Sequence, residues 1–192
     1  MHMVAADSNL SPDDLLALPD SKGLELVNGH IVEREMGARS GWIGGQLYRR
    51  LENHNECNRA GWVFPADAGF ILAESPTLLR KPDAAFVQLG RLPNEEIPEG
   101  YIRLVPDLVA EVVSPNDTAY EVQDKVQEYL SAGVKLLWIV YPQARIAHLY
   151  RVDGSFAILH DDDELSGEDI FPGFRCRLGD LFPLRSPATI VS

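Results

Sequence analysis

The sequence has only two cysteines, Cys57 and Cys176, among its 192 residues. Two cysteines so far apart form neither a disulfide framework nor a cysteine-based zinc site, so we expect free thiols. Long hydrophobic runs are also missing, since the run Leu136 to Tyr141 is far shorter than the roughly 20 residues of a membrane helix. The N-terminus lacks the basic and apolar succession of a signal peptide, which predicts a cytoplasmic protein with no membrane partner.

Basic residues are scarce relative to acidic ones. The chain has 17 Lys and Arg against 29 Asp and Glu, for a formal net charge of -12. Proteins that bind nucleic acid through its phosphates usually show the opposite balance, so we expect weak nonspecific affinity for DNA. A nuclease is not excluded, because carboxylates that hold a catalytic cation count in the total but are neutralised in the working site.

The chain has enough apolar residues for a packed core. Hydrophobic residues make up 45% of the sequence and charged residues 24%, which excludes global disorder. We expect a single domain over residues 11–184, with flexible segments at 1–10 and 185–192.

Turn and capping residues organise the first half of the chain. Ser11 predicts a helix that ends at about Leu18, and Asn28-Gly29 predicts a β-hairpin between two strand-like runs. Ser40 is expected to cap a second helix that runs from about Trp42 to Asn58. Further strands are expected at 62–64, 68–72 and 82–88, before an irregular excursion at 89–103.

The second half predicts a strand, a helix and a strand in succession. Residues 108–113 form a nearly continuous apolar run, typical of a central strand covered on both faces. Asn116 or Asp117 is expected to cap a helix that ends at about Ala132. A buried strand at 135–141 would then be reached by a right-handed parallel crossover, and a last hairpin is expected at 146–151 and 155–159.

Two acids in interior strands are the strongest chemical signal. Glu111 lies inside the central apolar strand, and an isolated buried carboxylate costs many kcal/mol unless something compensates it. A structural salt bridge to Lys125 or to an arginine is one explanation. Asp83 favours another, because two acids on separate strands can converge on a hard divalent cation such as Mg²⁺. Asp107 is too far along the strand to share that ion, and we interpret it as a strand-entry residue.

A lysine on the following helix can complete such a site. Lys125 lies at the edge of the apolar stripe that contains Val122, Val126 and Tyr129, so its ammonium can reach Glu111. There it could orient water or offset charge on a phosphoryl oxygen. The alternative is a lysine whose charged end lies in solvent.

Several segments, taken in order, resemble the Uma-type family of putative restriction endonucleases within the PD-(D/E)XK nuclease superfamily. They are Leu24 to Gly29, Lys81 to Asp83, Pro106 to Pro115, Lys125 with Tyr129 and Gly133-Val134, and Trp138 to Pro142. The resemblance covers about Ser11 to Phe182. It implies an α/β (α+β) restriction-endonuclease-like fold, with a mixed central β-sheet flanked by helices, N-terminal and C-terminal β-hairpins and a divalent-metal site.

The resemblance also implies roles for individual residues. Asp83 and Glu111 match the metal-binding acids, Lys125 matches a catalytic lysine moved from the strand to the next helix, and Glu25 matches a further acid that would add a metal ligand. Val113 stands where the superfamily usually has a lysine. These matches imply an endonuclease that uses Mg²⁺ or Mn²⁺ to hydrolyse DNA. The alternative is a non-catalytic binding or assembly module on the same fold, as a homodimer.

Overall fold

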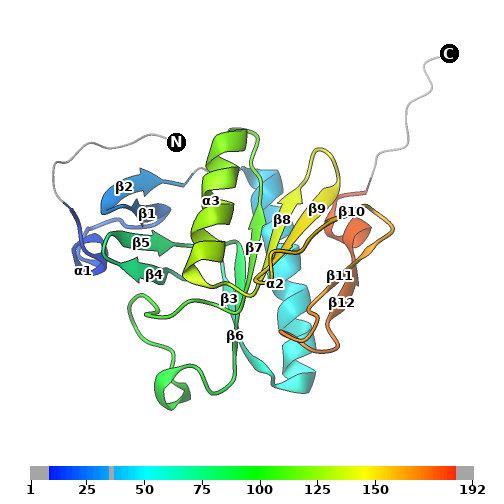
Figure 1. Ribbon diagram of the computed structural model, residues 1–192, viewed down its shortest axis with the longest axis horizontal. Coiled ribbons are helices and arrows are strands. Elements are labelled where there is room, and N and C mark those ends of the chain that lie inside the picture. The colour runs from blue at the N-terminus through cyan, green and yellow to red at the C-terminus, as the bar shows by residue number, and fades with distance from the viewer. Residues whose placement is uncertain (1–8, 35–36, 185–192) are drawn as a thin grey trace.

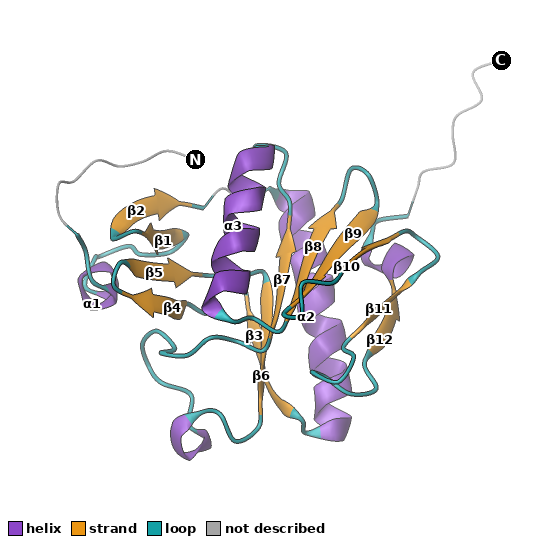
Figure 2. Ribbon diagram, viewed as in Figure 1, coloured by secondary structure: helices purple, strands orange, loops and turns teal. Residues whose placement is uncertain are grey.

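The computed structural model describes residues 9–34 and 37–184. It has the mixed α+β architecture that the sequence predicts, with a large central sheet, a smaller sheet beside it and helices packed on the sheets (Figures 1 and 2). Most of the expected flexible termini, residues 1–8 and 185–192, lie outside the described residues. No helix in the described part of the chain is long and apolar enough to cross a membrane.

The central sheet has six strands in the order β10-β9-β8-β7-β6-β3. Only β7 and β8 are parallel, and helix α3 (Ala119–Ala132) connects them; the other neighbours are antiparallel. The strands are β3 (Gly61–Pro65), β6 (Ala84–Gln88), β7 (Leu108–Val112), β8 (Leu136–Tyr141), β9 (Ile146–Arg151) and β10 (Phe156–Leu159). The central strand and the last hairpin that the sequence predicts are therefore both present.

Helices α2 (Ala38–Asn58) and α3 cover opposite faces of this sheet (Figure 1). Alternate residues of β7 face opposite sides, so Leu108 packs with the α2 side chains Ile43 and Leu47, whereas Val109 packs with Val126 of α3. The apolar run at 108–112 is thus explained by burial on both faces. The C-terminal part, with β11 (Glu164–Ser166), β12 (Arg175–Arg177) and the 3-10 helix η2 (Leu178–Leu181), adds to the α2 side.

A four-stranded antiparallel sheet lies beside the central sheet, in the order β2-β1-β5-β4 (Figure 2). Asn28 and Gly29 both have positive φ in the turn between β1 (Leu24–Val27) and β2 (His30–Glu33), which confirms the predicted hairpin. Helix α1 (Pro12–Leu16) packs on this sheet through Leu15. The other two strands are β4 (Phe70–Glu74) and β5 (Thr77–Arg80), and the excursion at 89–103 is irregular apart from the 3-10 helix η1 (Pro93–Glu95).

Both predicted caps of the long helices are wrong. Helix α2 begins at Ala38 with Gly37 as its N-cap, and the Ser40 hydroxyl instead contacts the Gly37 carbonyl and the Ser114 hydroxyl. Helix α3 is capped by Thr118, because Thr118 and Glu121 form a reciprocal capping box.

Strand boundaries also differ from the sequence predictions. The strand expected from Ala68 begins at Phe70, and the strand expected from Pro82 begins at Ala84, so Asp83 lies just before β6. Strand β5 was not predicted, nor was the β11–β12 pair.

Candidate functional site

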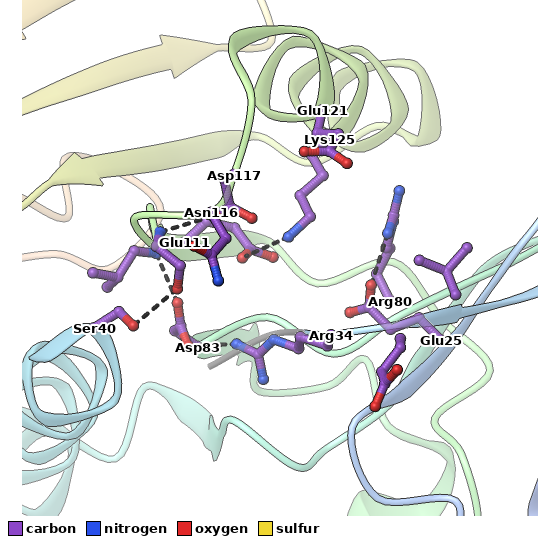
Figure 3. A pocket seen from close by; sticks show the side chains of 14 residues that line it. Glu25, Arg34, Ser40, Arg80, Asp83, Glu111, Asn116, Asp117, Glu121 and Lys125 are labelled. Carbon is purple, nitrogen blue, oxygen red and sulfur yellow. Dashed lines mark hydrogen bonds and ion pairs between the residues drawn. The ribbon is translucent and has the colours of Figure 1, made fainter. Parts of the chain in front are cut away.

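A polar pocket lies where the four-stranded sheet meets the central sheet beneath α3 (Figure 3). The free space within it is about 30 Å³, which is on the order of one ion or water molecule. The four residues singled out from the sequence, Glu25, Asp83, Glu111 and Lys125, all line it. The other lining residues are Val32, Glu33, Arg34, Ser40, Arg80, Val112, Ser114, Asn116, Asp117 and Glu121.

Asp83 lies at the start of β6, beside the end of β7. Ala84 pairs with Ala110 in the antiparallel register, so Asp83 is next to Glu111. One carboxylate oxygen of Asp83, Oδ2, accepts a hydrogen bond from the Val112 backbone N–H at 2.7 Å. The other, Oδ1, is paired with the Arg34 guanidinium. Both oxygens of this buried carboxylate therefore have protein partners.

Gly44 allows α2 to approach Asp83 closely. A Cβ atom at position 44 would lie 3.2 Å from the Asp83 Cβ and 3.4 Å from its Oδ1. The first contact is tighter than nine in ten real Cβ contacts, so a side chain here would require Asp83 to shift by a few tenths of an ångström. The absence of a side chain at Gly44 thus helps to set the position of Asp83.

Glu111 projects from β7 toward α3. Its Oε1 accepts a hydrogen bond from the Tyr129 hydroxyl at 2.6 Å, and its Oε2 lies 3.7 Å from the Lys125 Nζ (Figure 3). Lys125 and Tyr129 are one helical turn apart, so a single face of α3 supplies both contacts. The contact between Lys125 and Glu111 expected from helical spacing is present. The lysine beside Glu111 therefore comes from α3, and not from position 113 of the strand, where this chain has Val113.

The electrostatics of the pocket reflect the burial of two neighbouring carboxylates. Burial raises the pKa of Asp83 most, Arg34 lowers it, and the Glu111 carboxylate raises it again, to about 6. The charge of Glu111 raises the pKa of Lys125 and outweighs burial, so the ammonium form is favoured. A cation placed between the two carboxylates would relieve their repulsion.

Glu25 forms the far wall of the pocket. Its Oε2 accepts a hydrogen bond from Arg80 Nη1 at 2.7 Å, and its Oε1 accepts one from the Lys81 backbone N–H at 2.8 Å. Burial acts to raise the pKa of Glu25, but Arg80, Lys125 and the Lys81 N–H outweigh it, so the pKa is lowered. Arg80 is also bound to Glu128 of α3, which connects β1, β5 and α3.

The sequence did not single out Arg34 or Arg80, although both line the pocket. Arg34 is 49 residues from Asp83, and Arg80 is 55 residues from Glu25. No local spacing links such distant partners. The available signal was general, since a buried carboxylate such as Glu111 or Asp83 requires a cationic or hydrogen-bonding partner.

Asp107 lies outside the pocket, at the start of β7, as predicted. It is fully buried and forms ion pairs with Arg91 at 2.6 Å and with Lys135 at 2.8 Å. The Gln88 backbone N–H also donates to it at 2.8 Å. These contacts fix the entry to β7 and so hold Glu111 in register.

The donor set fits a single hard divalent cation. Within residues 9–34 and 37–184, no group of three or more His, Cys, Asp or Glu side chains is arranged to hold a metal ion. Mg²⁺, however, is usually held by one or two carboxylates together with waters and substrate phosphate. Asp83 and Glu111 are two such carboxylates, and both line the pocket.

The central sheet with α2 and α3 on its two faces, and with two acids at adjoining strand ends, defines a restriction-endonuclease-like domain. The chain belongs to the Uma2 family, described as "Putative restriction endonuclease", whose sequence profile matches residues 12–179. A crystal structure titled as a putative nuclease belonging to DUF820, from Anabaena variabilis, is similar to this chain with a TM-score of 0.74 and 18% identity. The match covers 90% of this chain and 97% of that one. No curated protein matches the sequence.

Proposed function

We propose that this protein is a nuclease that uses Mg²⁺ or Mn²⁺ to hydrolyse phosphodiester bonds in DNA. The observation that carries the proposal is the placement of Asp83 beside Glu111, with the Lys125 ammonium 3.7 Å from Glu111. Two carboxylates and one amine in a small polar pocket are suited to phosphodiester hydrolysis. Membership of a family described as "Putative restriction endonuclease" supports the same reaction.

In this proposal, Asp83 and Glu111 would hold the cation. Hydrogen bonds from the Val112 N–H to Asp83 and from the Tyr129 hydroxyl to Glu111 fix the two carboxylates in place. When bound, the cation would supply Lewis-acid charge to the scissile phosphate. Lys125 orients the attacking water and offsets negative charge that develops on the phosphoryl oxygens.

The proposed role of Glu25 follows from its contacts. Both of its oxygens accept hydrogen bonds from the protein, so we assign it to holding Arg80 in the pocket wall rather than to binding the ion directly. Glu25 thereby acts on the site through Arg80, whose guanidinium also contacts α3 at Glu128. Glu25→Gln should therefore weaken cleavage less than the loss of Asp83 or Glu111.

A cleavage assay tests the proposal. Supercoiled plasmid and short single-stranded and duplex DNA are incubated with wild-type protein in Mg²⁺, in Mn²⁺ and in EDTA. We expect cleavage only with a divalent cation, and a loss of at least about 100-fold in Asp83→Asn and Glu111→Gln, because loss of a direct ligand should exceed the usual cost of losing an outer-shell partner.

Asp124→Asn is the matched control. Asp124 is an exposed acid on α3 next to Lys125 and does not line the pocket, so its neutralisation should leave cleavage unchanged. Equal cleavage by wild type and Asp83→Asn would point to a contaminating nuclease and contradict the proposal. So would the absence of cleavage with either metal on every DNA tested.

One observation favours a second function. The carboxylates of Glu25, Asp83 and Glu111 are each paired inside the protein, as expected for a binding or assembly module that keeps the fold without turnover. That alternative predicts that Glu111→Gln lowers the free energy of unfolding while Mn²⁺ has no effect on the melting temperature. A melting-temperature rise with Mn²⁺ that disappears in Asp83→Asn would exclude a purely structural pocket.

A further inference from the structure

Arg34 occupies the position of a cation in the pocket. Its Nη2 is paired with Asp83 Oδ1, and its Nη1 donates to the Ala66 carbonyl at 3.2 Å. Burial acts to lower the pKa of this guanidinium, but the charges of Asp83, Glu111 and Glu25 outweigh burial and raise the pKa, so Arg34 lies within the field of three carboxylates. Only 6% of the Arg34 side chain is exposed. Figure 3 shows it directed at Asp83 from the end of β2.

The oxygen that Arg34 binds is the one a metal ion would need. Asp83 Oδ2 is committed to the Val112 N–H at 2.7 Å, which leaves Oδ1 as the oxygen available to a side chain or an ion. A divalent cation shared by Asp83 and Glu111 therefore competes with the guanidinium for Oδ1. Lys125 is paired instead with Glu111 Oε2, at 3.7 Å, on the other carboxylate of the site.

We propose that Arg34 is a built-in counter-ion of Asp83 that a divalent cation must displace, so that Arg34 sets the metal affinity of the site. The proposal rests on the two-carboxylate metal site assigned above. It adds a determinant of metal binding that belongs to neither the acids nor the lysine.

The charge of the pocket explains why displacement is favourable when metal is abundant. Six acidic residues and three basic residues line it, so negative charge is in excess even with Arg34 in place. A divalent ion carries twice the charge of a guanidinium and can contact both Asp83 and Glu111. Arg34 must be released before the metal can bind. The observed free energy of metal binding is therefore the free energy of binding to the carboxylates minus the cost of breaking the Arg34–Asp83 pair, so the affinity is lower than the carboxylates alone would give.

Calorimetric titration with Mn²⁺ in the absence of DNA tests this proposal. Arg34→Gln removes the competing charge, and we expect its Mn²⁺ affinity to exceed that of the wild type by about tenfold or more, a change of about 1.4 kcal/mol or more. The Mn²⁺-induced rise in melting temperature should increase in parallel. The double variant Arg34→Gln/Asp83→Asn should lose this binding, which would place the ion at Asp83.

Arg39→Gln is the matched control for the loss of one positive charge. Arg39 is exposed on the first turn of α2 and donates to the Pro142 carbonyl at 3.2 Å. Its removal should change the Mn²⁺ affinity by less than about twofold, since exposed charges are screened by solvent and salt. If Arg34→Gln does not fold, Arg34→Lys carries the test, because a lysine does not reproduce the forked guanidinium contact and should also tighten Mn²⁺ binding.

Each result decides the proposal. Tighter Mn²⁺ binding in the Arg34 variant but not in Arg39→Gln supports it, even if no DNA is cleaved, in which case only the proposed nuclease function fails. Equal or weaker binding in the Arg34 variant overturns it, as does the absence of Mn²⁺ binding in both the wild type and the variant. If DNA is cleaved in a metal-dependent way but the Arg34 variant does not bind Mn²⁺ more tightly, the nuclease function is supported and the role of Arg34 as a competitor is rejected.

Discussion

The hydroxyl of Tyr129 in α3 donates a hydrogen bond to the Glu111 carboxylate of β7 at 2.6 Å, and both side chains are buried. The bond holds the carboxylate in one orientation, with Lys125 on its other oxygen. Burial, together with the adjacent Glu111 charge, raises the pKa of Tyr129 well above its ordinary value, so Tyr129 remains a hydrogen-bond donor across the physiological range. A residue of the helix core thus positions a residue of the candidate site.

Tyr129→Phe keeps the ring and removes the hydroxyl. We expect a loss of about 1.5–3 kcal/mol in the free energy of unfolding, because a buried charged oxygen loses its donor. Urea denaturation measures this loss, and metal-dependent cleavage should fall with it as Glu111 becomes free to rotate. Tyr120→Phe is the control, because Tyr120 lies on the same helix with 85% of its surface exposed and should show neither effect.

The Asp83 carboxyl should titrate near pH 6, as followed by the carbon NMR signals of labelled aspartate. Glu111→Gln should lower this pKa and Arg34→Gln should raise it, because Glu111 repels the charged form and Arg34 attracts it. We expect changes of about one unit or more. Movement in the opposite direction in either variant would contradict the geometry of the pocket.

The same titration predicts how stability changes with pH. The folded pKa of Asp83 is about 6, against an ordinary value of 3.8, so folding takes up a proton between these values. The contribution of Asp83 to stability is therefore fully present below pH 3.8 and is lost as the pH rises through about 6. Unfolding of wild type and Asp83→Asn across this range should show the corresponding difference in slope.

Gly44 and Gly45 form a natural pair for testing the close approach of α2 to Asp83. A Cβ at Gly45 would meet nothing within 4 Å, so Gly45→Ala should stabilise the protein by roughly 0.5–1 kcal/mol through helix propensity. Gly44→Ala should lack this gain and should weaken Mn²⁺ binding, because its methyl group displaces Asp83. Equal stabilisation by both substitutions, with metal binding unchanged, would show that Asp83 is not held by this contact.

Lys125→Met tests the proposed role of the amine. Methionine keeps much of the aliphatic length, so the protein should stay folded. Because the amine is lost, we expect cleavage to fall by about 10²–10⁴-fold. Mn²⁺ binding should be retained or strengthened, because a positive charge near Glu111 is removed. Lys22→Met, at an exposed lysine outside the pocket, should cleave like the wild type.

Local patterns in the sequence predicted much of this arrangement. The apolar run around Glu111 identified a strand buried on both faces, and the helical spacing of Lys125 and Tyr129 placed both on the side of α3 that contacts that strand. These predictions succeeded because each depends on residues within a few positions of one another.

Other features depend on how the two sheets pack together. The partners of Arg34 and Arg80 lie 49 and 55 residues away, so neither pairing has a local signal. Strand β5 is only four residues long and pairs with β1 from much earlier in the chain. The predicted cap at Ser40 was wrong because α2 begins at Ala38, so Ser40 lies in its first turn and its hydroxyl contacts the Gly37 carbonyl and the Ser114 hydroxyl.

The chain passes between the two sheets more than once. It builds β1 and β2 of the smaller sheet, continues through α2 to β3 of the central sheet, returns for β4 and β5, and then enters β6. No single cut in the chain can separate the two sheets, so neither can be removed as a module or exchanged between proteins without rebuilding the other. Because Arg34 and Asp83 come from opposite sides of this junction, the pocket forms only when both sheets are present.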